Sequence, residues 1–169
     1  MDAQPKDWLQ QKLLDALAGF ELGVLGGLLM LGWCMLIVPL IGQPWWTIPN
    51  LLASKYFNAS DLGSGPGFPT LAGGAFQLVT AALVGAFAGF LVPIGRLSGI
   101  AVAISWYVAS YLYLWRRIAP LASAYSPQVV LMIGFFIFGS TLGYHWTLSL
   151  RREAARFRAE GEVLETRSA

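Results

Sequence analysis

The chain has 169 residues, a formal net charge of +2 and a single cysteine, Cys34. Its residues are 56% hydrophobic and only 12% charged, whereas about 25% are charged in an ordinary soluble domain. The composition therefore argues against a soluble globular domain. The lone cysteine excludes an intrachain disulfide and a cysteine-based zinc site, and no basic stripe indicates nucleic-acid binding.

Residues 1–19 form a predicted cytoplasmic amphipathic segment. A helix over residues 6–18 places its four leucines on one stripe, which favours a helix that lies on the membrane surface. The segment mixes acidic and basic residues, and no small-x-small cleavage site follows the first apolar run. It therefore differs from a cleavable signal, and we expect the first span to stay in the mature protein.

Four long apolar stretches follow, over residues 20–41, 71–94, 98–118 and 128–149. A helix of about 20 apolar residues spans the roughly 30 Å hydrocarbon core of a bilayer and satisfies its own backbone hydrogen bonds there. We therefore expect an all-α integral membrane protein, built as a four-transmembrane-helix antiparallel bundle.

Residues 42–70 form the only long connection between these spans, and we expect an extracytoplasmic loop there. Loops of this length in compact domains are usually functional or disordered. Trp45 and Trp46 suit an interfacial anchor at the headgroup level. Pro49 and Asn50 then predict a short interfacial helix with Asn50 as its N-cap, whose apolar side chains face lipid or protein.

The remaining connections are short. The link between the second and third spans is a tight turn around Pro93, Gly95 and Arg96, so these spans are expected to pack as an antiparallel hairpin. Residues 119–127 form a second predicted extracytoplasmic loop, which contains two prolines that stop helices.

Residues 150–169 form a predicted cytoplasmic charged tail, which either fixes orientation and solubility or docks a cytosolic partner. Its i,i+4 Arg–Glu pairs favour a solvated helix. Lysine and arginine are more frequent on the side of the two termini, which predicts that both termini are cytoplasmic and that the protein lies in the bacterial inner membrane. Arg116 and Arg117, on the opposite side, count against this orientation.

Small residues recur at about four-residue spacing in every span. Such stripes allow helix backbones to approach closely in lipid, where helices associate through van der Waals contact and hydrogen bonds. The predicted helix-packing residues are Gly19, Gly23, Gly27, Gly73, Ala81, Gly85, Gly89, Gly95, Gly99, Gly139 and Gly143.

Four polar side chains in or beside the spans are candidates for a polar site. Gln77 lies on the small-residue stripe of the second span, where its amide forms an interhelical hydrogen bond or contacts a substrate or ion. Glu21, Arg96 and His145 are expected at one depth near the cytoplasmic side. There they form a structural ion pair beside a snorkelling histidine, or they relay protons or hold an anion.

The sequence predicts no catalytic residue, no cofactor and no metal site. It has one histidine, no paired carboxylates in a span and no glycine-rich phosphate loop. The leading hypothesis is a non-catalytic accessory, assembly or structural subunit that packs with other membrane helices, with itself or with the lipid bilayer. A small oligomeric transporter or channel is the alternative, and an intramembrane lipid-modifying enzyme is third.

Overall fold

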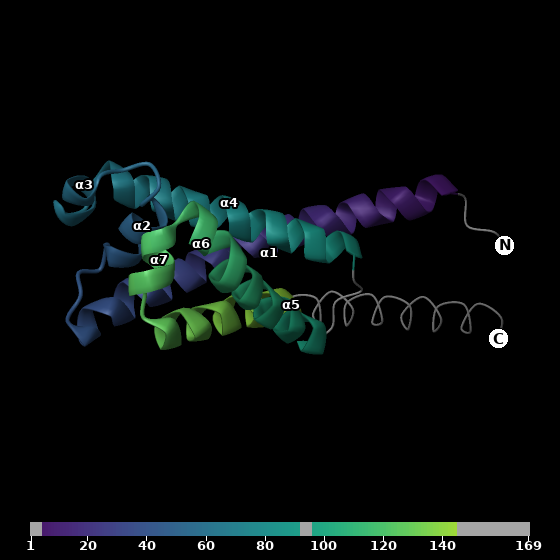
Figure 1. Cartoon of the computed structure of the whole chain (residues 1–169). Coiled ribbons are helices and arrows are strands. Elements are labelled where there is room, and N and C mark those ends of the chain that lie inside the picture. Colours follow the sequence, from purple (N-terminus) through teal and green to yellow (C-terminus); the bar gives the residue numbers. More distant parts are fainter. Residues whose placement is uncertain (1–4, 92–95, 145–169) are drawn as a thin grey trace, which may run out of the picture.

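The computed structural model describes residues 5–91 and 96–144, and within these ranges every regular element is helical (Figure 1). The predicted all-α class is therefore confirmed over this part of the chain. The elements are α1 (Pro5–Ile37), η1 (Val38–Ile41), α2 (Thr47–Leu52), α3 (Ala59–Gly63), α4 (Phe68–Leu91), α5 (Arg96–Ala109), the π-helix η2 (Ser110–Leu114), α6 (Trp115–Ile118), α7 (Pro120–Tyr125) and a final helix over Gln128–Tyr144.

Two of these helices are long and apolar enough to cross a membrane. They cover Lys12–Ile41, which includes most of α1, and Phe68–Leu91, which is α4. At about 1.5 Å per residue, the 24 residues of α4 extend about 36 Å, more than the roughly 30 Å hydrocarbon core.

The helix α1 runs unbroken through the boundary that was predicted at residue 19. The expected separate surface helix over residues 6–18 is therefore wrong as a distinct element, because its residues continue into the apolar stretch. Leucine, alanine and glutamate around this boundary are good helix formers, and the single Gly19 costs only about 1 kcal/mol. The helical path ends at Gly42, whose positive φ of 82° closes the 3-10 turn η1.

The predicted interfacial helix exists as α2, but it begins earlier and is buried along one side. It starts at Thr47 with Trp46 as its N-cap, so the assignment of Asn50 as N-cap is wrong. Asn50 instead lies inside the helix and is 2% exposed. The cause is tertiary packing, because α2 lies against α4 and α7 and does not rest on the molecular surface.

The stretch predicted as the third span is one helical path from Arg96 to Ile118, in which α5, η2 and α6 follow one another without a break. The loop expected over residues 119–127 contains α7, which is a correction. Pro120 occupies the first turn of α7, and the carbonyl of Pro127 accepts a hydrogen bond from Leu131 in the next helix. Both prolines therefore start helices, as the first helical turn permits.

The arrangement of the long helices differs from the expected hairpin. The long interface is between α1 and α4, whereas α4 and α5 make no extended contact within the described residues. The turn around Pro93 and Gly95 lies outside those residues. In Figure 1, α5 slopes at an angle to α4 and does not lie along it. Proximity along the chain therefore did not predict the packing partner.

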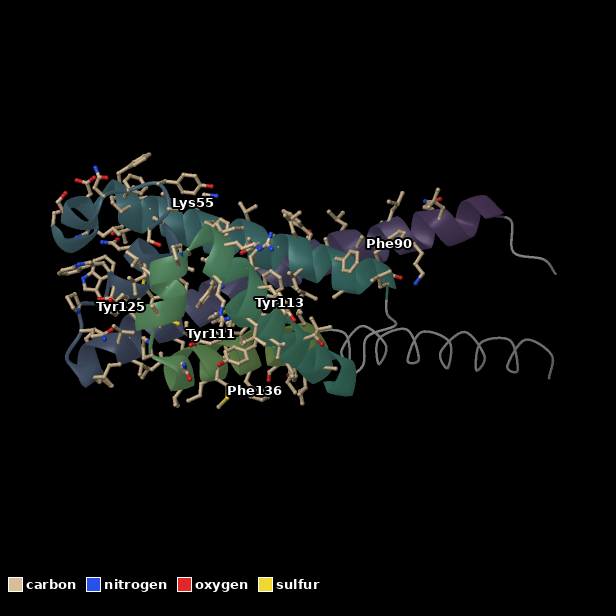
Figure 2. All side chains as sticks on the ribbon, viewed as in Figure 1. Lys55, Phe90, Tyr111, Tyr113, Tyr125 and Phe136 are labelled. Carbon is tan, nitrogen blue, oxygen red and sulfur yellow. The ribbon has the colours of Figure 1, made fainter. Side chains whose placement is uncertain are left out.

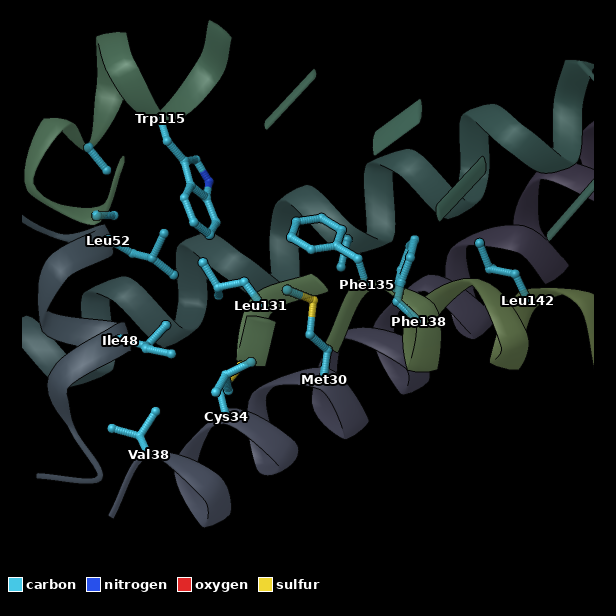
Figure 3. Close-up of a cluster of buried hydrophobic side chains, with 14 of the residues drawn as sticks. Met30, Cys34, Val38, Ile48, Leu52, Trp115, Leu131, Phe135, Phe138 and Leu142 are labelled. Carbon is cyan, nitrogen blue, oxygen red and sulfur yellow. The ribbon is translucent and has the colours of Figure 1, made fainter. Parts of the chain in front are cut away.

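A cluster of buried apolar side chains joins the helices (Figure 3). α1 contributes Met30, Cys34 and Val38, α2 contributes Ile48 and Leu52, α6 contributes Trp115, and the last helix contributes Leu131, Phe135, Phe138 and Leu142. In contrast, large apolar side chains project from the outer surface, including Phe90, Tyr113 and Phe136 (Figure 2).

Candidate functional site

The predicted small-residue stripes of α1 and α4 face each other. A Cβ atom added at Gly19 would overlap the carbonyl oxygen of Gly85 and lie 3.2 Å from the Cα of Gly89. One turn further along α1, a Cβ added at Gly23 would lie 2.9 Å from the Cα of Ala82. The two backbones are therefore in contact along this seam, which larger side chains would separate.

A second seam joins α5 to the final helix. A Cβ added at Gly99 would lie 2.8 Å from the Cα of Gly143, and one added at Gly139 would lie 3.3 Å from the Cα of Ala103. The final helix also packs on α1, since a Cβ added at Gly134 would lie 3.0 Å from the Cγ of Met30. Gly95 lies outside the described residues.

Two further predicted packing residues contact different partners. A Cβ added at Gly27 would lie 2.7 Å from the Cβ of Ala81, which continues the seam between α1 and α4. At Gly73 a Cβ would overlap the carbonyl oxygen of Pro49, so this glycine accommodates α2. The small-residue stripes thus lie mainly at contacts inside the chain and are covered there.

Gln77 is 5% exposed, and its amide nitrogen donates to the sulfur of Met30 at 3.2 Å. The adjacent cavity, which Cys34 and Trp115 also line, has a volume of about 10 Å³. That is close to the minimum of about 10–15 Å³ that holds one water molecule. The cavity that the described residues form beside Gln77 is therefore too small for a substrate larger than one water molecule.

Glu21, Arg96 and His145 were expected to lie at one depth in the membrane, and the structure describes only part of this group. Glu21 is exposed, on the side of α1 opposite to Gly23 and Met30, and it forms no ion pair with any described residue. α5 begins at Arg96, but His145 lies outside the described residues, as does the tail over residues 150–169. Whether the three side chains meet stays a prediction, because only Glu21 has a described side chain.

Asn50 forms a hydrogen-bonded knot that sequence reasoning missed. Its side-chain nitrogen donates to the carbonyls of Leu62 at 2.8 Å and Gly65 at 3.3 Å, and its side-chain oxygen accepts from the Thr70 hydroxyl at 2.7 Å. The Thr70 hydroxyl in turn accepts from the Gly67 backbone N–H at 3.1 Å. This knot connects α2 and the loop that follows it to the start of α4. The only sign of it in the sequence was a single amide side chain within the apolar run TIPNLL.

Trp45 and Trp46, the predicted anchor, pack edge to face with ring centroids 5.6 Å apart. Trp45 is 39% exposed. Trp46 also accepts the backbone hydrogen bond of Asn50 at 3.0 Å, so the pair adjoins the knot.

An aromatic column on the third helical path was also missed. Tyr107 stacks on Tyr111 with centroids 5.7 Å apart, and Tyr107 and Trp115 both pack against Phe135 of the final helix. The Tyr111 hydroxyl accepts a hydrogen bond from Gln128. Tyr107, Tyr111 and Trp115 follow one another at i,i+4 spacing, and this spacing was visible in the sequence.

An open groove separates α4 from α5. It has a volume of about 630 Å³ and is lined by residues between Thr80 and Ala88 on α4 and between Val102 and Ala109 on α5. The Thr80 hydroxyl donates to carbonyls of its own helix, so the groove presents almost entirely apolar groups. Among the described residues, no three His, Cys, Asp or Glu side chains converge as a metal site would require.

Comparisons with protein-family models, with characterised proteins and with solved structures found no match to this chain. The class of the protein is therefore inferred from its helices and packing alone.

Proposed function

We propose that the chain is a four-span integral membrane protein that serves as a non-catalytic subunit and binds other membrane components through its outer surface. Besides the two helices already long enough to cross a bilayer, the continuous path Arg96–Ile118 and the apolar helix Gln128–Tyr144 support two further spans. The large apolar side chains exposed on the outer faces suit contact with lipid.

The observation that favours a subunit over a transporter is the filled interior at Gln77. Its amide is paired with Met30, and the cavity beside it has a volume of about 10 Å³. A transporter or channel site needs polar groups that line a path for its substrate. The alternative of an oligomeric transporter with a site at Gln77 therefore has less support.

The small-residue seams narrow the choice of binding surface. Because Gly23 and Gly99 contact neighbouring helices of the same chain, they are covered and do not face a partner. The surfaces that remain exposed for another membrane component include the outer face of α1, the outer side of the final helix and the groove between α4 and α5.

Topology can be tested with single cysteines in a Cys34→Ala background. Ser60→Cys, Ala124→Cys and Ser168→Cys would be labelled in intact cells and in inverted vesicles with a membrane-impermeant maleimide. We propose both termini on the cytoplasmic side of the bacterial inner membrane, so the first two should react in cells and the third only in vesicles. Reaction of all three from the same side would exclude a four-span chain.

The subunit role can be tested by the mass of the complex after extraction in a mild detergent. A complex that contains a different membrane protein in fixed stoichiometry is the expected result. If the protein is recovered only as a homo-oligomer that conducts a solute in vesicles, the transporter alternative replaces the present proposal.

A further inference from the structure

Two cationic side chains, Arg116 and Arg117, follow the groove-lining residues of α5 on the same helical path. The groove-lining residues of α5 end at Ala109. Because η2 is a π-helix and takes about one residue more per turn, the same stripe then reaches Tyr113 and Arg117. Tyr113 is 71% exposed, and Arg117 is exposed at the end of the helical path.

Within the described ranges, no acidic side chain neutralises the charge at this end of the groove. The guanidinium groups of Arg116 and Arg117 form no ion pair or hydrogen bond with any residue that the structure describes. Arg116 follows Ala109 by seven positions, which is about 10 Å along a helix. A tyrosine followed by two arginines at the end of a membrane helix is the pattern expected at the headgroup level.

We infer that this groove binds one acyl chain of an anionic phospholipid, with the phosphate of its headgroup held by Arg116 and Arg117. The apolar walls match the hydrocarbon chain, and the uncompensated guanidinium groups match the phosphate. The inference rests on the four-span arrangement proposed above. It also gives a reason for the two arginines that oppose the charge bias of the termini.

The probe is an equimolar mixture of phosphatidylglycerol and phosphatidylcholine with the same acyl chains, added to the full-length protein in detergent. Native mass spectrometry then counts the lipids bound per chain. The unmodified protein should retain phosphatidylglycerol in preference to phosphatidylcholine. Arg116→Gln and Arg117→Gln should each lower this preference about fivefold. Lys12→Gln, which removes a charge in the N-terminal part of α1 at the other end of the molecule (Figure 1), should leave the preference unchanged.

A second pair of variants tests the apolar part of the groove. Ser105→Phe places a ring in the groove from an exposed position and should reduce the binding of both lipids equally. Leu25→Phe adds the same ring to an exposed position of α1, which does not line the groove, and should have no effect. Thermal unfolding of each variant confirms that it is folded.

The inference is overturned if the unmodified protein binds both lipids equally or retains neither. It is also overturned if the arginine variants keep the full preference, or if Leu25→Phe lowers binding as much as Ser105→Phe. The cysteine-labelling pattern reports on the four spans independently, so a failed lipid preference in a correctly labelled protein rejects this site alone.

Discussion

Gly19 on α1 and Gly85 on α4 lie so close that a Cβ at either position would overlap the carbonyl oxygen of the other. The contact is reciprocal and joins backbone to backbone. A substitution at either glycine must therefore move a whole helix, since no flexible side chain is available to give way.

The first prediction concerns this seam. Gly85→Leu should lower the free energy of unfolding by about 3 kcal/mol, the upper end of the usual cost of overpacking, because the rigid α1 backbone occupies the added volume. Unfolding in mixed micelles would measure the change. Gly32→Leu is the matched control, because a Cβ there meets nothing within 4 Å. Equal destabilisation by both variants would show that loss of glycine, and not the seam, is responsible.

The second prediction concerns the Asn50 knot. Thr70→Val should cost about 1–3 kcal/mol, because it leaves the buried Asn50 oxygen and the Gly67 N–H without their hydrogen-bond partner. Asn50→Leu should cost at least as much, and the double variant should cost less than the sum. Ser64→Ala removes an exposed hydroxyl that bonds to Asp61 and should change stability little. Additive costs for Asn50 and Thr70 would contradict the coupling.

The third prediction concerns Gln77. Gln77→Leu keeps most of the side-chain volume and removes one hydrogen bond to a weak sulfur acceptor, so stability should change by less than about 1 kcal/mol. Abundance in the membrane and thermal unfolding would both be measured. If Gln77→Leu impaired the function of the protein in cells while its stability was unchanged, Gln77 would instead belong to a functional polar site.

The fourth prediction concerns the aromatic column. Trp115 is 2% exposed among residues of several helices, so Trp115→Ala should cost about 3–5 kcal/mol through the cavity that it leaves. Tyr125→Ala, at a 68% exposed position of the nearby α7, is the control and should be nearly neutral. If Trp115→Ala lowered the free energy of unfolding only slightly, the neighbouring helices would have moved together and closed the cavity.

Local physical chemistry made the all-helical class and the start of α4 predictable. Long apolar runs without helix breakers predicted α4 to begin at residue 71, and it begins at Phe68. The glycine spacing also identified residues that the structure places at helix contacts, because only a stripe free of side chains permits such an approach. Whether all four helices cross a bilayer remains a prediction that the cysteine experiment tests.

The errors arose where distant residues decide the structure. Asn50 suits an N-cap by its local sequence, but partners 12 to 20 residues away place it inside α2. The hairpin of the second and third spans was inferred from a short link, yet α4 packs on α1 because their glycine stripes match. The groove between α4 and α5 follows from that choice of partner and has no local signal.

The π-helix η2 gives the third helical path one residue more than an α-helix of the same number of turns would hold. Deletion of Tyr113 would therefore leave an ordinary α-helix with the same number of turns, and Trp115 would keep its direction toward the buried cluster. The same deletion within α5 would instead rotate every later residue by about 100° about the helix axis. The π-helix is thus a point at which one residue can be gained or lost without turning the exposed arginines toward the protein.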